Sequence, residues 1–203
     1  MMRQILRGSF LLLVACTGCF GFEARHSSEP LIPGAKTEFQ RYVGDMFVLP
    51  EIAFHLYPGN RETSGMPFPI PPPPPQCAPA AQHPPFHVEV AFRPSLNGFT
   101  FDPTRVDLEI PGMPKTRPDA LRGPYDCSAV SGVPTDYSRL PSAALPLKTG
   151  VTTCMWLEFQ VPTPCPQQRF AIQLGGLALS GVDYALPKVD FRELRGFGTF
   201  AIP

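Results

Sequence analysis

The sequence predicts an all-β protein, an immunoglobulin-like or related antiparallel β-sandwich with long proline-rich loops. Two observations support this prediction: 28 of the 203 residues are proline, and short stretches of alternating apolar and polar residues recur along the chain. Proline inside a helix costs roughly 3 kcal/mol, which excludes long helices. Many short strands separated by turn residues are typical of a sandwich. The 16 phenylalanines supply enough apolar surface for a core.

Residues 1–15 have the layout of an export signal. Arg3 and Arg7 precede an apolar run from Phe10 to Ala15, and the segment contains no acidic residue. The run is shorter than the roughly 20 apolar residues that a membrane-spanning helix needs. We therefore expect residues 1–15 to be removed as a signal peptide.

The end of this signal is more specific. The sequence Leu13-Val14-Ala15-Cys16 resembles the lipobox of bacterial lipoproteins, and the resemblance covers only the leader. It implies that Cys16 is lipidated and becomes the first residue of a membrane-anchored chain, with palmitate among its acyl groups. Cys19 is the alternative, because cleavage before it would leave an even set of four cysteines. The family pattern also implies the bacterial cell envelope, and the outer membrane (its periplasmic or surface face) more than the inner one, since no Asp follows either cysteine.

Beyond the signal we expect a tether over residues 16–36 and a single β-sandwich domain over residues 37–203. A proline-rich insertion at about 65–86 interrupts this domain. Proline fixes φ near −65° and lacks an N–H, so the insertion favours polyproline II and cannot join a sheet centrally. We interpret it as a stiff spacer between two strands. The alternative is a docking motif for an aromatic groove.

Within the domain, period-2 alternation assigns one apolar face to each of several strands. The apolar positions are Ile52, Phe54 and Leu56; Val88, Val90 and Phe92; Phe99, Phe101, Val106, Leu108 and Ile110; Met155, Leu157, Phe159 and Val161; and Phe170, Ile172 and Leu174. Asn97-Gly98 is a hairpin-turn signal. Asp102-Pro103 predicts a bend or bulge within one strand. Residues 111–150 predict a long connection that carries at most short edge strands.

Motifs for catalysis, metals and cofactors are absent from the sequence. It contains neither Gly-x-Ser-x-Gly nor His-Glu-x-x-His. His83 and His87 are four residues apart, but the two prolines between them forbid the helix that would bring their rings together. Asp107 and Glu109 lie on the polar side of one strand, which we interpret as a solvated face rather than a glycosidase pair or a calcium site. We therefore expect no enzyme activity, no cofactor and no metal.

Four cysteines, Cys77, Cys127, Cys154 and Cys165, predict two disulfides, since exported chains meet an oxidising environment. Cys154 opens a strand and Cys165 lies beyond its far end. At about 3.3 Å per residue these two are roughly 20 Å apart, far over the limit of about 7 Å between the Cα atoms of a disulfide. We therefore predict the pairs Cys127–Cys154 and Cys77–Cys165.

One aromatic residue stands out as a candidate for ligand contact. Trp156 lies on the polar side of its strand beside Glu158, where it marks a binding surface or simply covers the sheet. The formal net charge of zero gives no reason to expect nucleic acid. The sequence thus predicts a membrane-anchored, non-catalytic binding or structural component of the cell envelope, with another envelope protein or a glycan as partner. A carbohydrate- or ligand-binding module is the alternative, and an enzyme of an unrecognised type is the third and least favoured one.

Overall fold

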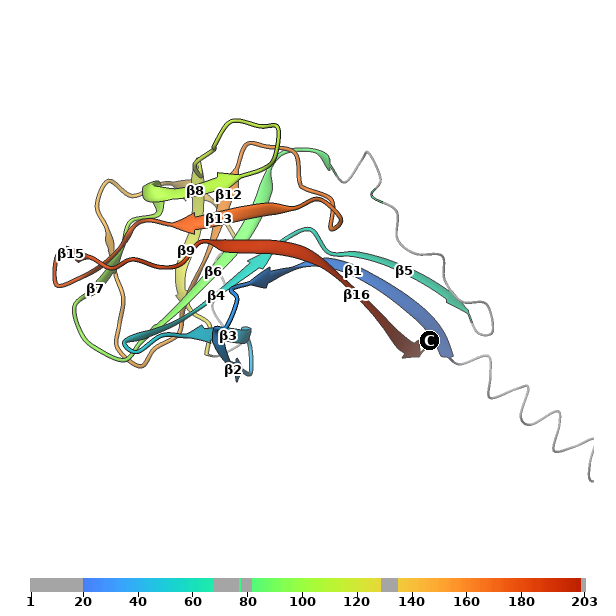
Figure 1. The fold of residues 1–203 in the computed structure, drawn as a ribbon, viewed down its shortest axis with the longest axis horizontal. Helices are drawn as coiled ribbons and strands as arrows, with labels where there is room; N and C mark the ends of the chain where they lie inside the picture. Colours follow the sequence, from blue (N-terminus) through green and yellow to red (C-terminus); the bar gives the residue numbers. More distant parts are fainter. Residues whose placement is uncertain (1–19, 68–76, 78–81, 129–134, 202–203) are drawn as a thin grey trace, which may run out of the picture.

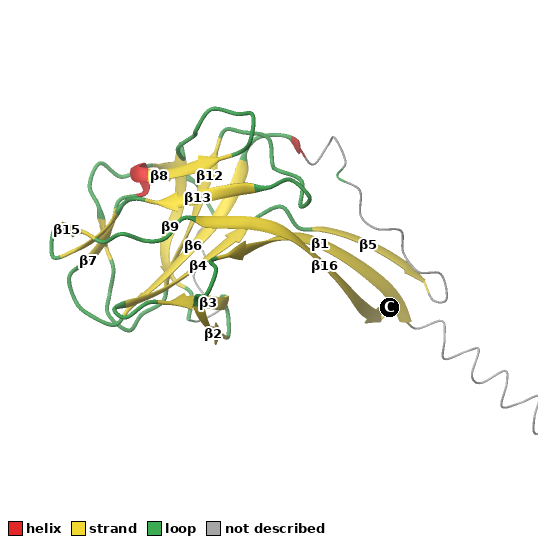
Figure 2. Ribbon diagram, in the orientation of Figure 1, coloured by secondary structure: helices red, strands yellow, loops and turns green. Residues whose placement is uncertain are grey.

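The computed structural model describes residues 20–67, 77, 82–128 and 135–201, which form an all-β antiparallel sandwich (Figures 1 and 2). One layer is a seven-stranded sheet, in spatial order β10 (Ser138–Arg139), β9 (Ala120–Asp126), β12 (Thr153–Phe159), β6 (Phe86–Pro94), β4 (Ile52–Pro58), β3 (Gly44–Val48) and β2 (Lys36–Gln40). The other is a five-stranded sheet, β5 (Glu62–Pro67), β1 (Phe20–Leu31), β16 (Val189–Ala201), β13 (Phe170–Leu174) and β8 (Val106–Glu109). A four-stranded sheet, β11 (Leu145–Pro146), β7 (Phe99–Phe101), β14 (Leu177–Leu179) and β15 (Val182–Asp183), lies at one end.

The core between the layers consists of the apolar positions that the alternation assigns. Phe54, Val90 and Leu157 of the seven-stranded sheet share one buried cluster with Leu108 and Ile172 of the five-stranded sheet. Aromatic contacts join the layers directly. The ring of Phe86 meets that of Phe170 edge-on, with centroids 5.6 Å apart. Burial of these faces leaves the odd-numbered positions of β6 and the even-numbered positions of β12 pointing away from the core.

The expectation of a tether over residues 16–36 is wrong for residues 20–31, which form β1. This strand pairs with β16 along its whole length and with β5 near its N-terminus. The sequence hides it because its inward positions are small or polar, as His26 and Ser28 illustrate, each only 4% exposed. Asn60 satisfies this polar stretch: its side chain donates to the Ser28 hydroxyl at 2.8 Å and accepts from the Ser28 N–H at 3.3 Å.

The segment around Asp102-Pro103 also differs from the prediction of one bent strand. A 3-10 turn, η2 (Pro103–Arg105), separates β7 from β8, and the two strands belong to different sheets. The Asp102 carboxylate caps this turn by accepting from the Thr104 N–H at 2.9 Å. Asn97-Gly98 does form a turn, with Gly98 at φ +92°, but β6 and β7 do not pair across it. It therefore moves the chain from one sheet to another.

The connection predicted for residues 111–150 contains one full strand, β9, beside the short strands β10 and β11. The sequence conceals β9 because Gly123-Pro124 interrupts it. Gly123 has φ +114°, and the pairing of β9 with β12 shifts register between Cys154 and Trp156. A Cβ at Gly123 would lie 3.1 Å from the Cys154 carbonyl oxygen, so this bulge requires glycine.

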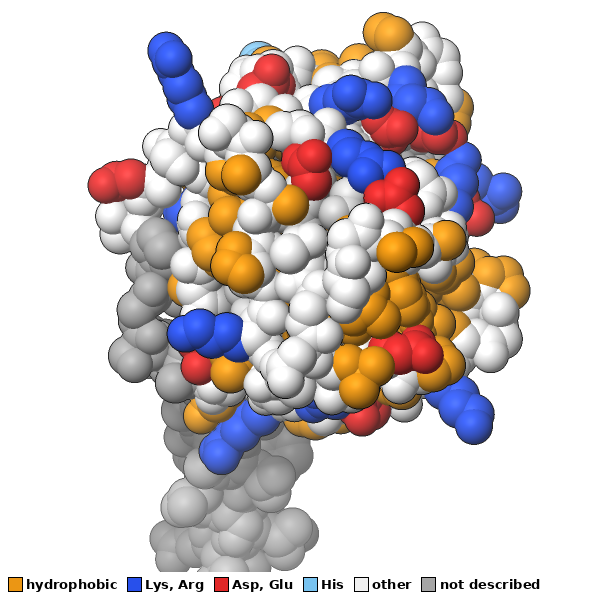
Figure 3. Space-filling view, turned by 90° about the vertical axis from the view of Figure 1, so that its left-hand side faces the viewer, with side chains coloured by type: hydrophobic (Ala, Val, Ile, Leu, Met, Phe, Trp, Pro, Cys, Tyr) orange, Lys and Arg blue, Asp and Glu red, His pale blue; other side chains and the backbone are white. Residues whose placement is uncertain are grey.

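Two further expectations concern residues outside the described part of the chain. These are the signal with its lipidation candidates, within residues 1–19, and most of the proline-rich insertion, residues 68–76 and 78–81. Within the described part, no helix is both long and apolar enough to cross a bilayer. At the end of the sandwich that Figure 3 presents, Lys and Arg side chains lie among Asp and Glu side chains, without a patch of a single sign.

Candidate functional site

The outward face of the seven-stranded sheet carries a row of aromatic and charged residues across four strands. The antiparallel register sets Tyr57 of β4 opposite Glu89 of β6, Glu89 opposite Trp156 of β12, and Trp156 opposite Arg122 of β9. Residues directly opposite one another across strands share a face of the sheet. The prediction that Trp156 points away from the core is confirmed, since its strand buries Met155 and Leu157 instead.

A chain of hydrogen bonds links two of these side chains, Trp156 and Glu89, through Tyr125 of β9. The indole N–H of Trp156 donates to the Tyr125 hydroxyl at 3.2 Å, and that hydroxyl donates to Glu89 Oε1 at 2.8 Å. Burial raises the pKa of the Glu89 carboxyl above its usual value, against the opposing effects of Tyr125 and Arg122. Burial and the bond to Glu89 raise the pKa of Tyr125 to about 12. Tyr125 is thus a neutral, fixed donor at physiological pH.

Arg122 lies between two aromatic rings. Its guanidinium carbon is 5.2 Å from the centroid of the Trp156 ring and 5.3 Å from that of Tyr137. The Nε atom is buried and has no hydrogen-bond partner among the described residues. A guanidinium stacked in this way directs its N–H donors along its own plane, away from the faces of the two rings.

A second pair of side chains borders this row. The imidazole of His87 stacks on Tyr137 with centroids 4.9 Å apart, and its Nε2 lies 3.2 Å from Glu158 Oε2. Gln160 donates to the other oxygen of Glu158 at 2.9 Å. We call the residues Tyr57, Glu89, Arg122, Tyr125, Tyr137 and Trp156, with the flanking His87–Glu158 pair, the aromatic cluster. It offers ring faces, a guanidinium and carboxylates on one surface.

The local backbone holds this cluster in place. The disulfide Cys127–Cys154, with Cα atoms 5.7 Å apart, joins the end of β9 to β12 next to the Gly123 bulge. Gly59 provides a second close approach, because a Cβ there would meet the His87 carbonyl oxygen at 3.1 Å and the Trp156 ring at 3.8 Å. Arg122 and Trp156 are therefore positioned by the covalent frame as well as by packing.

Both predicted disulfides are present. Besides Cys127–Cys154, the structure contains Cys77–Cys165, with Cα atoms 5.6 Å apart. Cys154 is fully buried in a small apolar cluster on the outward face, together with Met46, Ala53 and Ala91. The geometric reasoning that separated Cys154 from Cys165 holds, since β12 runs between them.

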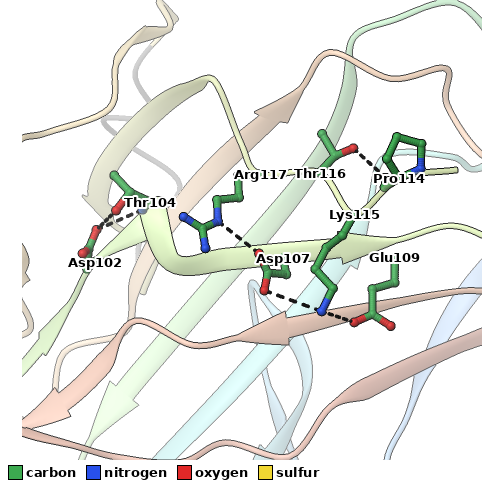
Figure 4. A network of polar contacts seen from close by, with 8 residues as sticks. All are labelled: Asp102, Thr104, Asp107, Glu109, Pro114, Lys115, Thr116 and Arg117. Carbon is green, nitrogen blue, oxygen red and sulfur yellow. Dashed lines mark hydrogen bonds and ion pairs between the residues drawn. The ribbon is translucent and has the colours of Figure 1, made fainter.

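The carboxylates Asp107 and Glu109 do not join the aromatic cluster. They lie on β8, in the other sheet, where Figure 4 shows them among basic side chains. Lys115 Nζ is 2.8 Å from Glu109 Oε1, and Lys188 contacts the other oxygen of Glu109. These lysines lower the pKa of Glu109 to about 2. Arg117 Nε lies 3.2 Å from Asp107 Oδ1. A carboxylate held ionised by two lysines is unsuited to act as a general acid.

The histidines of the sequence are separated in the structure. His87 belongs to the aromatic cluster, whereas the Nδ1–H of His55 donates to the Asp45 carbonyl oxygen, 2.7 Å away on the neighbouring strand. In the part of the chain that the structure describes, no group of three or more His, Cys, Asp or Glu side chains is placed to hold a metal ion.

Sequence reasoning identified Trp156 but not the residues around it. Glu89 is marked by its position on the polar side of β6, yet only the adjacency of β6 and β12 makes it a neighbour of Trp156. Arg122 and Tyr125 lie in the strand that Gly123-Pro124 conceals. Their common position on one surface follows from the strand order, which local patterns do not specify.

Comparisons with known proteins add little to this geometry. Among solved structures, the chain is similar to an uncharacterized β-sandwich protein from Clostridium difficile 630, with a TM-score of 0.34 and 8% identity. The match covers 77% of this chain and 97% of the other. No protein-family model matches the chain, and no curated protein matches it.

Proposed function

We propose that this chain is a non-catalytic binding module of the bacterial cell envelope, anchored to a membrane by lipid, and that its aromatic cluster binds carbohydrate. The observation that supports the proposal most is the position of Trp156 beside Arg122 and Glu89 on an outward sheet face. Sugars present apolar C–H faces that stack on aromatic rings, and hydroxyls that pair with guanidinium and carboxylate groups. A mostly preformed surface of this kind binds without a large ordering cost.

The anchor is proposed from the leader alone. The lipobox-like sequence ending at Cys16 implies diacylglycerol on the sulfur, and several acyl chains hold a protein at a membrane where one chain does so only marginally. Mass spectrometry of the N-terminal peptide, from protein extracted from its native membrane, tests this. We expect a lipid-modified cysteine at residue 16, or at residue 19 as the alternative. An unmodified terminus beyond residue 19 contradicts the proposal.

A glycan array tests the carbohydrate site. It is probed with residues 20–203, which carry every described strand and neither lipidation candidate and are called the soluble domain below. We expect binding to a restricted set of envelope glycans, and a loss of at least about tenfold in affinity for Trp156→Ala and for Arg122→Ala, the usual scale for a central aromatic or Arg contact. The chain offers a matched control: Arg41 lies over the ring of Tyr42 at 5.6 Å, an exposed arginine–tyrosine pair outside the cluster. Arg41→Ala should bind as the parent does. If Arg122→Ala and Arg41→Ala lose equal affinity, or if the array shows no glycan binding, the proposal is contradicted.

A further inference from the structure

A hollow lies on the outward face of the five-stranded sheet, in the other layer from the aromatic cluster. Its volume is about 730 Å³, within the range of small-molecule sites. The register sets Glu109 of β8 opposite Ala171 of β13, Ala171 opposite Asp190 of β16, and Asp190 opposite Leu31 of β1. All four residues line the hollow, and the loop after β8 borders it with Pro111, Gly112 and Met113.

The hollow exists because its central residue is small. Ala171 has larger neighbours on both adjacent strands, and its own side chain leaves the space above it unfilled. The rings of Phe170 and Phe191 stack 4.4 Å apart beneath this part of the sheet. Met113, which is 39% exposed, supplies an apolar wall. The floor and one side therefore suit an apolar group of modest size.

Positive charge dominates the border of the hollow. Four cations line it, Lys115, Arg169, Lys188 and Arg192, against two carboxylates, Glu109 and Asp190. Three of the cations already have acidic partners. Lys115 and Lys188 both contact Glu109, and Arg192 Nη2 lies 3.1 Å from Glu29 on β1.

Arg169 differs from the other three. It has no ion pair or hydrogen bond with any residue that the structure describes. It directly precedes β13 and lines the hollow together with Arg192 of β16. Among the cations of the hollow, Arg169 is therefore the one whose guanidinium has no acidic partner among the described residues. An oxyanion bound in the hollow would supply that partner.

We propose that this hollow binds a small, monomeric amphiphile with one oxyanion group, a carboxylate or a phosphate. Its charged group pairs with Arg169 beside Arg192, and its apolar part lies over Ala171 against Met113. A planar guanidinium matches both kinds of oxyanion through two parallel N–H···O bonds.

Calorimetric titration of the soluble domain with octyl phosphate, octanoate, octyl glucoside and inorganic phosphate tests the proposal. We expect saturable binding of at least one of the two anionic amphiphiles below its micelle-forming concentration, and their relative affinities identify the preferred oxyanion. Octyl glucoside, with the same tail and no charge, and inorganic phosphate, with charge and no tail, should each bind at least about tenfold more weakly. Equal binding of octyl glucoside, or binding only to anionic lipid vesicles, overturns the proposal.

Variants locate the site. Arg169→Gln should weaken binding roughly tenfold, the scale of one charge-assisted contact, whereas Arg139→Gln on β10 of the other sheet should leave it unchanged. Ala171→Leu should fill the hollow and abolish binding. If Ala171→Leu alters the thermal transition, the two arginine variants decide the question. Equal affinity in Arg169→Gln and the parent contradicts the proposal, as does an equal loss in both arginine variants.

Discussion

On the outward face of the seven-stranded sheet, Glu89 is held by the Tyr125 hydroxyl within a partly buried cluster of rings, whereas on the outward face of the five-stranded sheet, Glu109 is held by two exposed lysines. The two carboxylates occupy equivalent outward positions on their strands, and their pKa values move in opposite directions. Burial raises that of Glu89, and the lysines lower that of Glu109 to about 2. The first face is a fixed surface of hydrogen-bonded aromatic groups, and the second is a solvated network of ions.

This difference indicates two kinds of recognition. Exposed ion pairs contribute little to stability, are weakened by salt and exchange readily with a charged ligand. Hydrogen-bonded aromatic side chains on a disulfide-braced frame hold their geometry before a ligand arrives. This difference is the basis for proposing carbohydrate binding at the first face and anion binding at the second.

Removing the disulfide Cys127–Cys154, which braces the aromatic face, should lower the free energy of unfolding more than any other change considered below. The pair Cys127–Cys154 closes a sequence separation of 27 residues, and a disulfide of this size stabilises by about 3 kcal/mol. Cys127→Ser with Cys154→Ser should lower the free energy of unfolding by that order in denaturant titrations. Affinity for an anionic amphiphile in the Ala171 hollow should not change. A variant as stable as the parent would show that this disulfide does not brace the face.

Removing the indole of Trp156 should cause the next largest loss of stability. Trp156→Ala removes a partly buried side chain together with its bond to Tyr125, and should cost about 2 kcal/mol, below the range for a fully buried aromatic residue. Tyr42→Ala, at a ring that is 48% exposed, should change stability by no more than about 0.5 kcal/mol. If the two variants lose equal stability, Trp156 is an ordinary surface residue and the contrast between the faces fails.

The pH dependence of Glu89 provides a smaller and more specific test. Because its folded pKa lies above 4.5, the native state holds this proton more tightly than the unfolded chain does. The parent therefore loses stability as pH rises from about 4.5 toward the raised pKa. Glu89→Gln cannot titrate and still accepts from Tyr125, so its stability relative to the parent should increase with pH across this window. A constant difference between the two proteins would contradict the burial of this carboxyl.

The contribution of Glu109 to stability should have the opposite pH dependence to that of Glu89, and the smallest size of the four. Its folded pKa of about 2 lies below 4.5, so its contribution to stability is present above pH 4.5 and is lost as pH falls toward 2. Glu109→Gln should flatten the acid limb of the stability curve at low ionic strength, and added salt should reduce the difference. An acid limb that is identical in both proteins would mean that the lysine contacts are not formed in solution.

Strands with a local alternation of apolar and polar residues can be predicted from the sequence. Strands that depend on contacts with distant residues cannot. The alternation of β6 and β12 determines which side chains enter the core, and the length of β12 excludes a Cys154–Cys165 bridge, one of the three possible pairings of the four cysteines. By contrast, β1 is not recognisable locally, since its buried Ser28 is satisfied by Asn60, 32 residues away. The bulge at Gly123 hides β9 for a similar reason: its pairing with β12 and β10, and not its local pattern, makes it a strand.

The residues of the candidate site also differ in whether they can be predicted from the sequence. The outward direction of Trp156 follows from its strand, but its neighbours Glu89 and Arg122 follow from the order β9-β12-β6, which no short stretch of sequence encodes. The hollow depends even more on long-range order. Ala171 forms its centre only because β8 and β16 place larger residues on either side.

Intrinsic fluorescence tests the central claim most directly, because the chain contains a single tryptophan and all of the indole signal comes from the proposed carbohydrate site. The measurement is a titration of the soluble domain with the strongest-binding soluble oligosaccharide from the glycan array, followed in parallel by calorimetry. The predicted result is a saturable change in Trp156 emission whose dissociation constant agrees with the calorimetric value, weakened at least about tenfold in Arg122→Ala and unchanged in Arg41→Ala. Calorimetric binding with no change in the emission of Trp156, and equal affinity in Arg122→Ala, would contradict the assignment.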